Sequence, residues 1–164
     1  MTAHILNIED VSLQKWSHGD RFAFETAWVG LKLGSRKLGF NVTVVPPGKR
    51  AFPYHAHHGN EEMFFVLEGR GSIRIGGSTR AIRPGDFISL PPGRESAHQI
   101  INDSSSTLRY LAVSTMETPE VVEYPDSRKL GVLAGAPAGR SPTEDSIRHF
   151  TRMSDGVDYW EGEK

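Results

Sequence analysis

Residues 48–69 read GKRAFPYHAHHGNEEMFFVLEG, and this stretch decides the fold. His55 and His57 are two residues apart, and residues i and i+2 of an extended chain project from the same face. The polar turn that follows allows the chain to come back, and Glu62 then opens an apolar run typical of a strand. We therefore expect both imidazoles and the Glu62 carboxylate to converge on one point inside a β-structure.

A second stretch, residues 85–102, reads GDFISLPPGRESAHQIIN and carries another histidine. His98 follows a Pro-Pro-Gly turn and lies on a separate expected strand, from which it can supply a third imidazole. Three imidazoles and one carboxylate suit Zn, Ni, Fe or Mn, and they leave positions open for water or substrate. The sequence thus predicts one divalent metal ion, with four ligands: His55, His57, Glu62 and His98.

Short apolar segments with Gly or Pro at their ends fill residues 38–115. About eight strands of this length and spacing indicate a sandwich or barrel rather than βαβ units. Gly76-Gly77 is a hairpin signal between two of them. No internal repeat is visible, so we expect a single barrel. The expected strands are 38–45, 63–67, 72–75, 79–83, 87–90, 97–101 and 107–114, with one more at 22–29 in the preceding arm.

The chain divides into an N-terminal arm at 1–37, the barrel at 38–115 and a tail at 116–164 that belongs to the same domain. Proline and glycine recur through the tail, so we expect a long, irregular segment that wraps the barrel. Two places in it, Met116–Val122 and Thr143–Phe150, could each form a short helix.

The pattern resembles the two motifs of the cupin superfamily, which are G, H-x-H, E and G, followed by G, P-x-G, H and N. Two gaps depart from that pattern. Gly48 is one residue further from His55 than usual, and four residues rather than two separate Gly93 from His98. The resemblance implies an all-β, double-stranded β-helix (a jelly-roll barrel) with its metal inside. The matching residues are Gly48, His55, His57, Glu62 and Gly69, then Gly85, Pro91, Gly93, His98 and Asn102.

Some neighbours of the expected ligands need a separate assignment. Strand alternation allows only one of Glu61 and Glu62 to point inward, and the motif spacing selects Glu62. His58 has the wrong parity and is expected at the rim. Asn102 is expected to cap a turn.

The chain also resembles short bacterial cupins with a long tail, some of them provisionally called sugar-phosphate isomerases. In that chemistry the metal is a Lewis acid on a small polar metabolite, and Glu61, Tyr54 or His58 would move the proton. An Fe(II)-dependent dioxygenase, a non-catalytic small-molecule binder and a structural module stay open. Lys49, Arg50 and Arg94 are either ligands for a substrate anion or solvated loop charges. Side chains expected to line the pocket or pack behind it are Phe52, Tyr54, Met63, Phe65, Phe87, Gln99 and Tyr110.

Composition limits the partners. The chain has 19 Lys and Arg against 20 Asp and Glu, which argues against nucleic acid as a partner. It has no cysteine, so thiolate ligands and disulfides are excluded. No secretory signal and no apolar stretch of membrane-spanning length is visible, so we expect no membrane partner and a cytoplasmic protein. Aromatic residues in the arm suggest a homodimer interface: Trp16, Phe22, Phe24 and Trp28.

Overall fold

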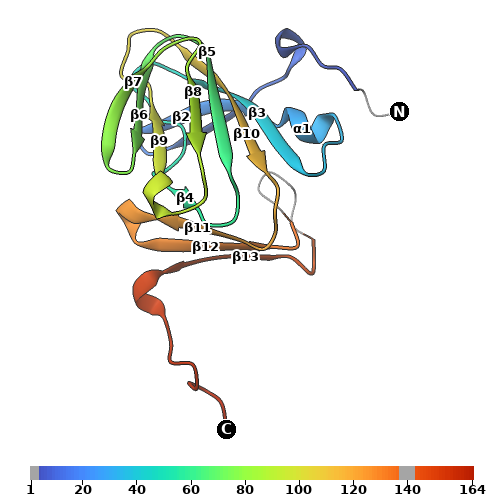
Figure 1. The fold of residues 1–164 in the computed structure, drawn as a ribbon, viewed down its shortest axis with the longest axis vertical. Helices are drawn as coiled ribbons and strands as arrows, with labels where there is room; N and C mark the ends of the chain where they lie inside the picture. The colour runs from blue at the N-terminus through green and yellow to red at the C-terminus, as the bar shows by residue number, and fades with distance from the viewer. Residues whose placement is uncertain (1–3, 137–142) are drawn as a thin grey trace.

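A computed structural model describes residues 4–136 and 143–164, and its strands form three antiparallel sheets (Figure 1). The largest sheet contains the strand that was expected at residues 22–29, and it also contains the strand that carries Glu62. Its strand order is β1 (Gln14–His18), β2 (Phe22–Ala27), β3 (Leu38–Val45), β10 (Leu108–Thr115), β5 (Glu62–Glu68) and β8 (Phe87–Leu90).

Two smaller sheets complete the molecule. One has three strands, β7 (Ser78–Ile82), β6 (Gly71–Ile75) and β9 (His98–Ile101). The other has four, β13 (Ile147–Arg152), β12 (Lys129–Ala134), β11 (Glu120–Tyr124) and β4 (Ala56–His57). In the part of the chain that the structure describes, helical structure is limited to α1 (Val29–Lys32) and the 3-10 turns Ile8–Asp10, Arg94–Ser96, Pro125–Ser127 and Met153–Asp155.

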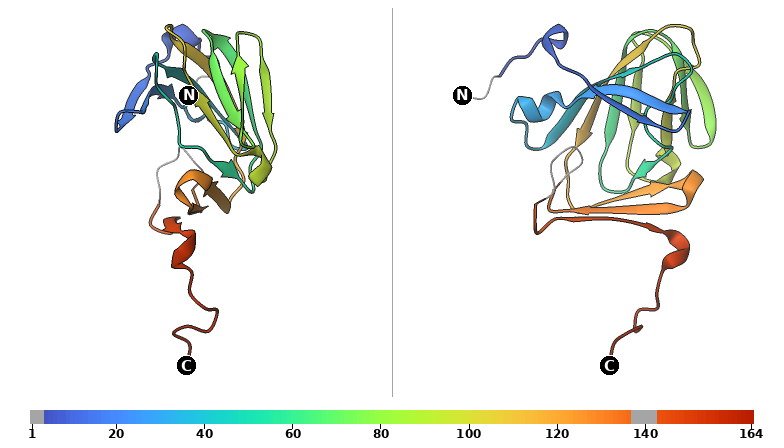
Figure 2. Two further views of the ribbon diagram at one scale, coloured as in Figure 1. Left: turned by 90° about the vertical axis from the view of Figure 1, so that its left-hand side faces the viewer. Right: turned by 180° about the vertical axis from the view of Figure 1, so that it is seen from behind.

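The core lies between the six-stranded and three-stranded sheets. Along β10 every second residue is buried, which is the pattern of a strand with one face on the core. The buried side chains of both sheets form one cluster, so the two sheets close a barrel (Figure 2). Its members include Val45, Phe64, Val66, Leu108 and Tyr110 from the first sheet, and Ile73, Ile82 and Ile100 from the second.

Glycines in the turns allow the strands to close tightly. Gly76 and Gly77 both have positive φ and join β6 to β7, as the hairpin signal predicts. Gly69 also has a positive φ of 79°, and a Cβ on it would lie 2.0 Å from the carbonyl oxygen of Thr107. No other residue fits there, which gives the glycine at the end of the first motif a steric reason.

The predicted all-β barrel is confirmed, and each expected strand within residues 38–115 is present with its ends shifted by a residue at most. The arm is continuous with the barrel, because β1 and β2 extend the six-stranded sheet. The aromatic residues of the arm differ in how far they are exposed. Phe24 packs on Phe52, whereas Trp16 is 53% exposed.

The tail contains more regular structure than the sequence predicts. Strands β11, β12 and β13 form a sheet across one end of the barrel (Figure 1). The two suggested helices are wrong, because β11 and β13 occupy those places. Val121 and Val122 are β-branched, which favours a strand. β11 pairs with β12 on one side and with β4 on the other, so these pairings stabilise strands although prolines recur in the tail. The part of the predicted tail at residues 137–142 lies outside the described residues.

The chain after β13 runs away from the barrel (Figure 2). Large apolar side chains there are exposed: Met153, Val157, Tyr159 and Trp160. Within residues 4–136 and 143–164, no helix is both long and apolar enough to cross a membrane.

Candidate metal centre

A pair of backbone hydrogen bonds brings His55 and His98 together. The amide of His55 donates to the carbonyl of His98 at 3.1 Å, and the amide of His98 donates back to His55 at 2.8 Å. The two imidazole rings lie 4.5 Å apart between centroids. An isolated β-bridge thus joins two residues that are 43 positions apart in the sequence and places their side chains in one site.

Glu62 begins β5 and reaches the same point. Its Oε2 lies 3.1 Å from Nε2 of His98 and 3.6 Å from Nε2 of His57. One ligand atom each from His55, Glu62 and His98 falls within 4.8 Å of the others. A cluster of two imidazoles and one carboxylate is thus present where the sequence predicts a metal.

Backbone carbonyls set the orientation of the two imidazoles. Nδ1 of His55 donates to the carbonyl of Pro53 at 2.7 Å, and Nδ1 of His98 donates to the carbonyl of Ser96 at 3.0 Å. A carbonyl can only accept, so each neutral ring carries its proton on Nδ1 and its lone pair on Nε2. This is the arrangement of a metal-binding histidine whose second nitrogen is held by the protein.

Unpaired buried atoms support the fit of a cation. Oε2 of Glu62 and Nε2 of His98 are both buried, and neither makes a hydrogen bond. Two lone pairs 3.1 Å apart repel each other unless a positive charge lies between them. Nitrogen and oxygen donors of this kind suit a divalent transition metal.

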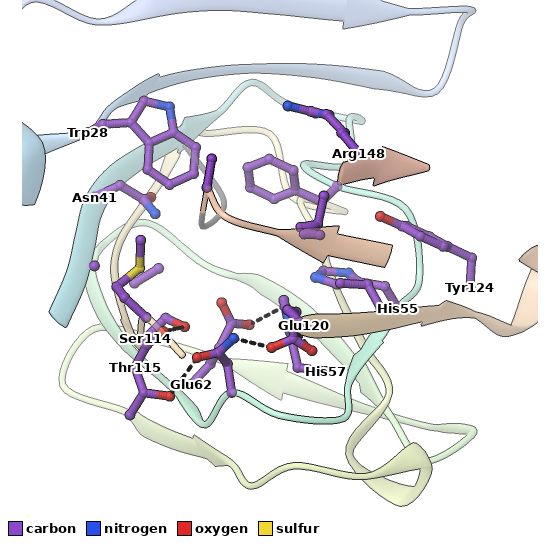
Figure 3. A pocket seen from close by; sticks show the side chains of 18 of the residues that line it. Trp28, Asn41, His55, His57, Glu62, Ser114, Thr115, Glu120, Tyr124 and Arg148 are labelled. Atoms are coloured by element: carbon purple, nitrogen blue, oxygen red, sulfur yellow. Dashed lines mark hydrogen bonds and ion pairs between the residues drawn. The ribbon is translucent and has the colours of Figure 1, made fainter. Parts of the chain in front are cut away.

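His57 lies beside this cluster and outside its three members. Its Nε2 faces Glu62, and its Nδ1 lies 3.8 Å from Oε1 of Glu120 (Figure 3). The ring centroids of His55 and His57 are 5.1 Å apart. Its assignment as the fourth ligand stays a prediction.

The charges of the site follow from burial and from these contacts. Burial, together with the neighbouring His98 and His57, lowers the pKa of His55 to about 3, so this ring is neutral. Burial alone would raise the pKa of Glu62, but the neighbouring His98, His57 and His55, in their protonated forms, lower it to about 2. The site therefore offers a neutral imidazole and an ionised carboxylate, the forms that bind a metal.

Glu120 is a site residue that sequence reasoning missed. It lies on β11, is 2% exposed, and accepts hydrogen bonds from the backbone amides of His58 and Gly59 and from the side chain of Asn60. Burial opposes ionisation of Glu120, but the contacts with His57, Gly59 and Asn60 lower its pKa. Burial opposes protonation of His57, yet Glu120 and Glu62 together raise its pKa. Glu120 thus fixes the turn after the two histidines.

A cavity of about 260 Å³ opens beside these residues. Its wall is largely apolar, and the C-terminal strands close one side of it. Of the side chains that were expected to line a pocket, Phe52 and Tyr110 do so, whereas the ring of Phe65 packs at a tilt against the exposed Phe87 and is not among the described lining residues. The apolar wall includes Trp28, Phe52, Phe64, Tyr110, Val122 and Leu133.

The three residues considered as proton acceptors are not among the described lining residues. Glu61 is exposed. Tyr54 is buried under Arg74, whose guanidinium lies 3.6 Å from its ring centroid, and its hydroxyl accepts from the amide of Gly77. His58 lies at the rim, as parity predicts, where its Nε2 is 3.2 Å from Oε2 of Glu123. Their positions do not favour them in proton transfer inside the cavity.

The cations that were considered for anion binding have partners elsewhere. Lys49 donates to the carbonyl of Asp20, and Arg50 donates to the side chain of Gln99. Arg94 lies 3.1 Å from Glu123. Asn102 has its expected role, because its buried side chain donates to the carbonyls of Val45 and Ser106 and caps the turn.

Comparisons with known proteins agree with this geometry. The family model described as "Cupin domain" matches residues 41–114. A quercetin 2,3-dioxygenase of Bacillus subtilis is 24% identical over 101 residues, which is 60% of this chain and 30% of that protein. An uncharacterized protein of Methanocaldococcus jannaschii is 31% identical over 84 residues, 49% of this chain and 65% of that protein. The chain thus spans less than two thirds of the length of either of these curated relatives.

Two crystal structures resemble nearly the whole chain. A provisionally assigned sugar phosphate isomerase from Acidithiobacillus ferrooxidans is 26% identical with a TM-score of 0.78, covering 94% of this chain and 95% of that one. A sugar phosphate isomerase from a cupin superfamily, from Silicibacter pomeroyi, is 21% identical with a TM-score of 0.75, covering 92% and 94%. Together with the barrel and its histidine–glutamate cluster, the family match shows that residues 41–114 of this chain form a cupin domain.

Proposed function

We propose that this protein is a metal-dependent enzyme that isomerises a small polar metabolite of the sugar phosphate class. One observation carries the proposal. Unpaired lone pairs of buried imidazole and carboxylate groups converge beside a cavity of about 260 Å³. The provisionally assigned isomerase from Acidithiobacillus ferrooxidans, 26% identical over nearly the whole chain, supports the substrate class.

The proposed ligands are His55, His57, Glu62 and His98, and the ion is Zn, Ni, Fe or Mn. When bound, such an ion polarises a substrate carbonyl and stabilises the negative charge that develops on its oxygen. The chain's own residues prepare the site for this. The carbonyls of Pro53 and Ser96 hold two of the rings in place.

Glu120 has a separate part in this proposal. It holds the Nδ1 side of His57, so that Nε2 turns toward Glu62. A carboxylate behind a ligating histidine fixes the ring and raises its basicity. The apolar wall around Phe64 and Tyr110 excludes water from the reacting end of a substrate, which strengthens every charge interaction there.

An Fe(II)-dependent dioxygenase is the second candidate, because the quercetin 2,3-dioxygenase of Bacillus subtilis matches 60% of this chain. The same ligand types hold Fe(II). The two functions differ in their need for oxygen, which gives a direct test.

The test assays the purified full-length chain, loaded in turn with Zn, Ni, Fe(II) or Mn, on a panel of aldose and ketose phosphates under anaerobic conditions. We expect metal-dependent interconversion that is lost in Glu62→Ala and kept in Glu61→Ala, the exposed neighbour. Oxygen consumption with a flavonol by the Fe(II) form, and no anaerobic turnover, would favour the dioxygenase. Ligand binding without turnover in either assay would make the protein a binder instead.

A further inference from the structure

The cavity carries one Lys or Arg among its described lining residues, and that residue is Arg148. It lies on β13, opposite Leu133 of β12, and Leu133 also lines the cavity. Cross-strand partners share a face of a sheet, so Arg148, which is itself exposed, lies on the face that Leu133 presents to the cavity. Residues from the tail thus add a cationic group to a site that the barrel otherwise builds.

The guanidinium of Arg148 makes no ion pair with a described carboxylate. It lies near two aromatic residues. The ring of Phe150 is 5.9 Å away, and burial raises the pKa of the Tyr124 hydroxyl while Arg148 opposes that rise. An arginine without a carboxylate partner keeps its N–H donors free for a planar or tetrahedral oxyanion.

The two carboxylates of the cavity lie away from Arg148. Figure 3 shows Arg148 and Trp28 along one side of the pocket, and His57 and Glu62 along the opposite side. Glu62 and Glu120 are held there by imidazole and amide groups. The cavity therefore has a positive group on one side and negative groups on the other. A substrate with one anionic group fits this distribution of charge in one orientation.

We propose that Arg148 binds the anionic group, a phosphate or a carboxylate, of a substrate whose reacting end lies at the cluster of His55, Glu62 and His98. This inference rests on the proposed function, because it names how the same site selects its substrate. It also assigns a role to the C-terminal sheet. The sheet closes one side of the cavity and supplies the group that binds the charged end of the substrate.

The basic residues next to the cupin motifs do not line the described part of the cavity, and this supports the assignment of Arg148 as its cationic group. Lys49, Arg50 and Arg94 each have a partner in the fold, and none of them is among the described lining residues. The C-terminal strand thus provides the cation that the motif loops do not.

The test uses isothermal titration calorimetry on the metal-loaded full-length chain. Three six-carbon probes separate the charge types: glucose 6-phosphate, gluconate and glucose. We expect the wild-type protein to bind one of the anionic probes more tightly than glucose, and the preferred probe identifies the phosphate or the carboxylate. Arg148→Gln should weaken that probe about 10-fold while binding of glucose stays the same.

Two further variants serve as controls for position and for charge. Arg152→Gln removes an exposed arginine from the same strand, outside the cavity, and should leave all three probes unchanged. Arg148→Lys keeps the charge and should retain most of the preference for the anionic probe. Melting temperature and metal content show that each variant is folded and loaded.

The inference is overturned if wild-type protein binds both anionic probes no better than glucose, or if Arg148→Gln binds them as the wild type does. It is also overturned if Arg148→Lys loses the preference as fully as Arg148→Gln. A failure of the proposed function looks different. In that case the purified chain holds no metal or turns over no sugar phosphate, while the effect of Arg148 on charged probes persists.

Discussion

Nε2 of His98 lies 3.1 Å from Oε2 of Glu62, yet neither buried atom makes a hydrogen bond. The Nδ1 proton of His98 is committed to the carbonyl of Ser96, so two lone pairs face each other. Leaving two buried polar atoms unpaired costs about 1–3 kcal/mol each, which a bound cation would offset. This contact is the basis for a metal at the centre of the barrel.

Replacing Glu120 by Gln should weaken metal binding without removing it. The amide cannot carry the charge that holds the Nδ1 side of His57, so the ring is less well fixed. We expect affinity for Zn or Mn to fall about 10-fold to 100-fold, measured by competition with a chelator. Glu117→Gln is the matched control, because this nearby side chain is exposed. Equal affinity of both variants and the wild type would show that Glu120 does not position His57.

The metal-free protein should lose stability as pH falls, and His55 should contribute to that loss. Its pKa is about 3 in the folded chain against 6.5 ordinarily, so below pH 6.5 the unfolded chain takes up a proton that the folded chain does not. Its contribution is complete above pH 6.5 and falls by up to about 1.4 kcal/mol per pH unit as pH drops toward 3.

Urea unfolding of the metal-free protein between pH 6.5 and 4.5 measures this effect. That window lies above the ordinary pKa of 4.5 for Glu62, whose own contribution is lost at lower pH, toward about 2. His55→Gln should give a flatter profile of unfolding free energy, and His149→Gln, an exposed control, should follow the wild type. Parallel profiles for His55→Gln and the wild type would contradict the neutral state of His55.

The homodimer and the cytoplasmic location stay predictions. Trp16 on the edge strand β1 is 53% exposed and offers apolar area for a second copy. We expect a dimer by size-exclusion chromatography with light scattering, and a monomer after Trp16→Lys. Trp160→Lys, at a tryptophan that is 70% exposed in the C-terminal segment, is the comparison. A dimer that survives the first change and not the second would place the interface at the tail.

Much of the barrel could be predicted because its signals are local. Gly76-Gly77 marks a hairpin, and the alternation along residues 107–114 marks a strand with one buried face. Parity allows only one of Glu61 and Glu62 to point inward, and the motif spacing selects Glu62, which faces the cluster, whereas Glu61 is exposed. In these cases the neighbours in sequence determine which way a side chain points.

The tail could not be predicted in the same way, because its strands depend on partners far along the chain. Val122 of β11 pairs with His57, and β12 pairs with both β11 and β13. For the same reason the sequence does not predict that Glu120 and Arg148 lie at the cavity, because no neighbouring residue in the sequence marks them as site residues. Their roles come from the sheet that carries them to the cavity.

Elemental analysis of the native protein, purified without chelators, tests the metal centre most directly. We predict about one equivalent of a divalent transition metal per chain, lost in His98→Ala and in Glu62→Ala and retained in His149→Ala. Added metal should raise the melting temperature of the wild type and have little effect on the first two variants. A chain that holds no metal, and whose melting temperature responds to none of Zn, Ni, Fe or Mn, would contradict the account.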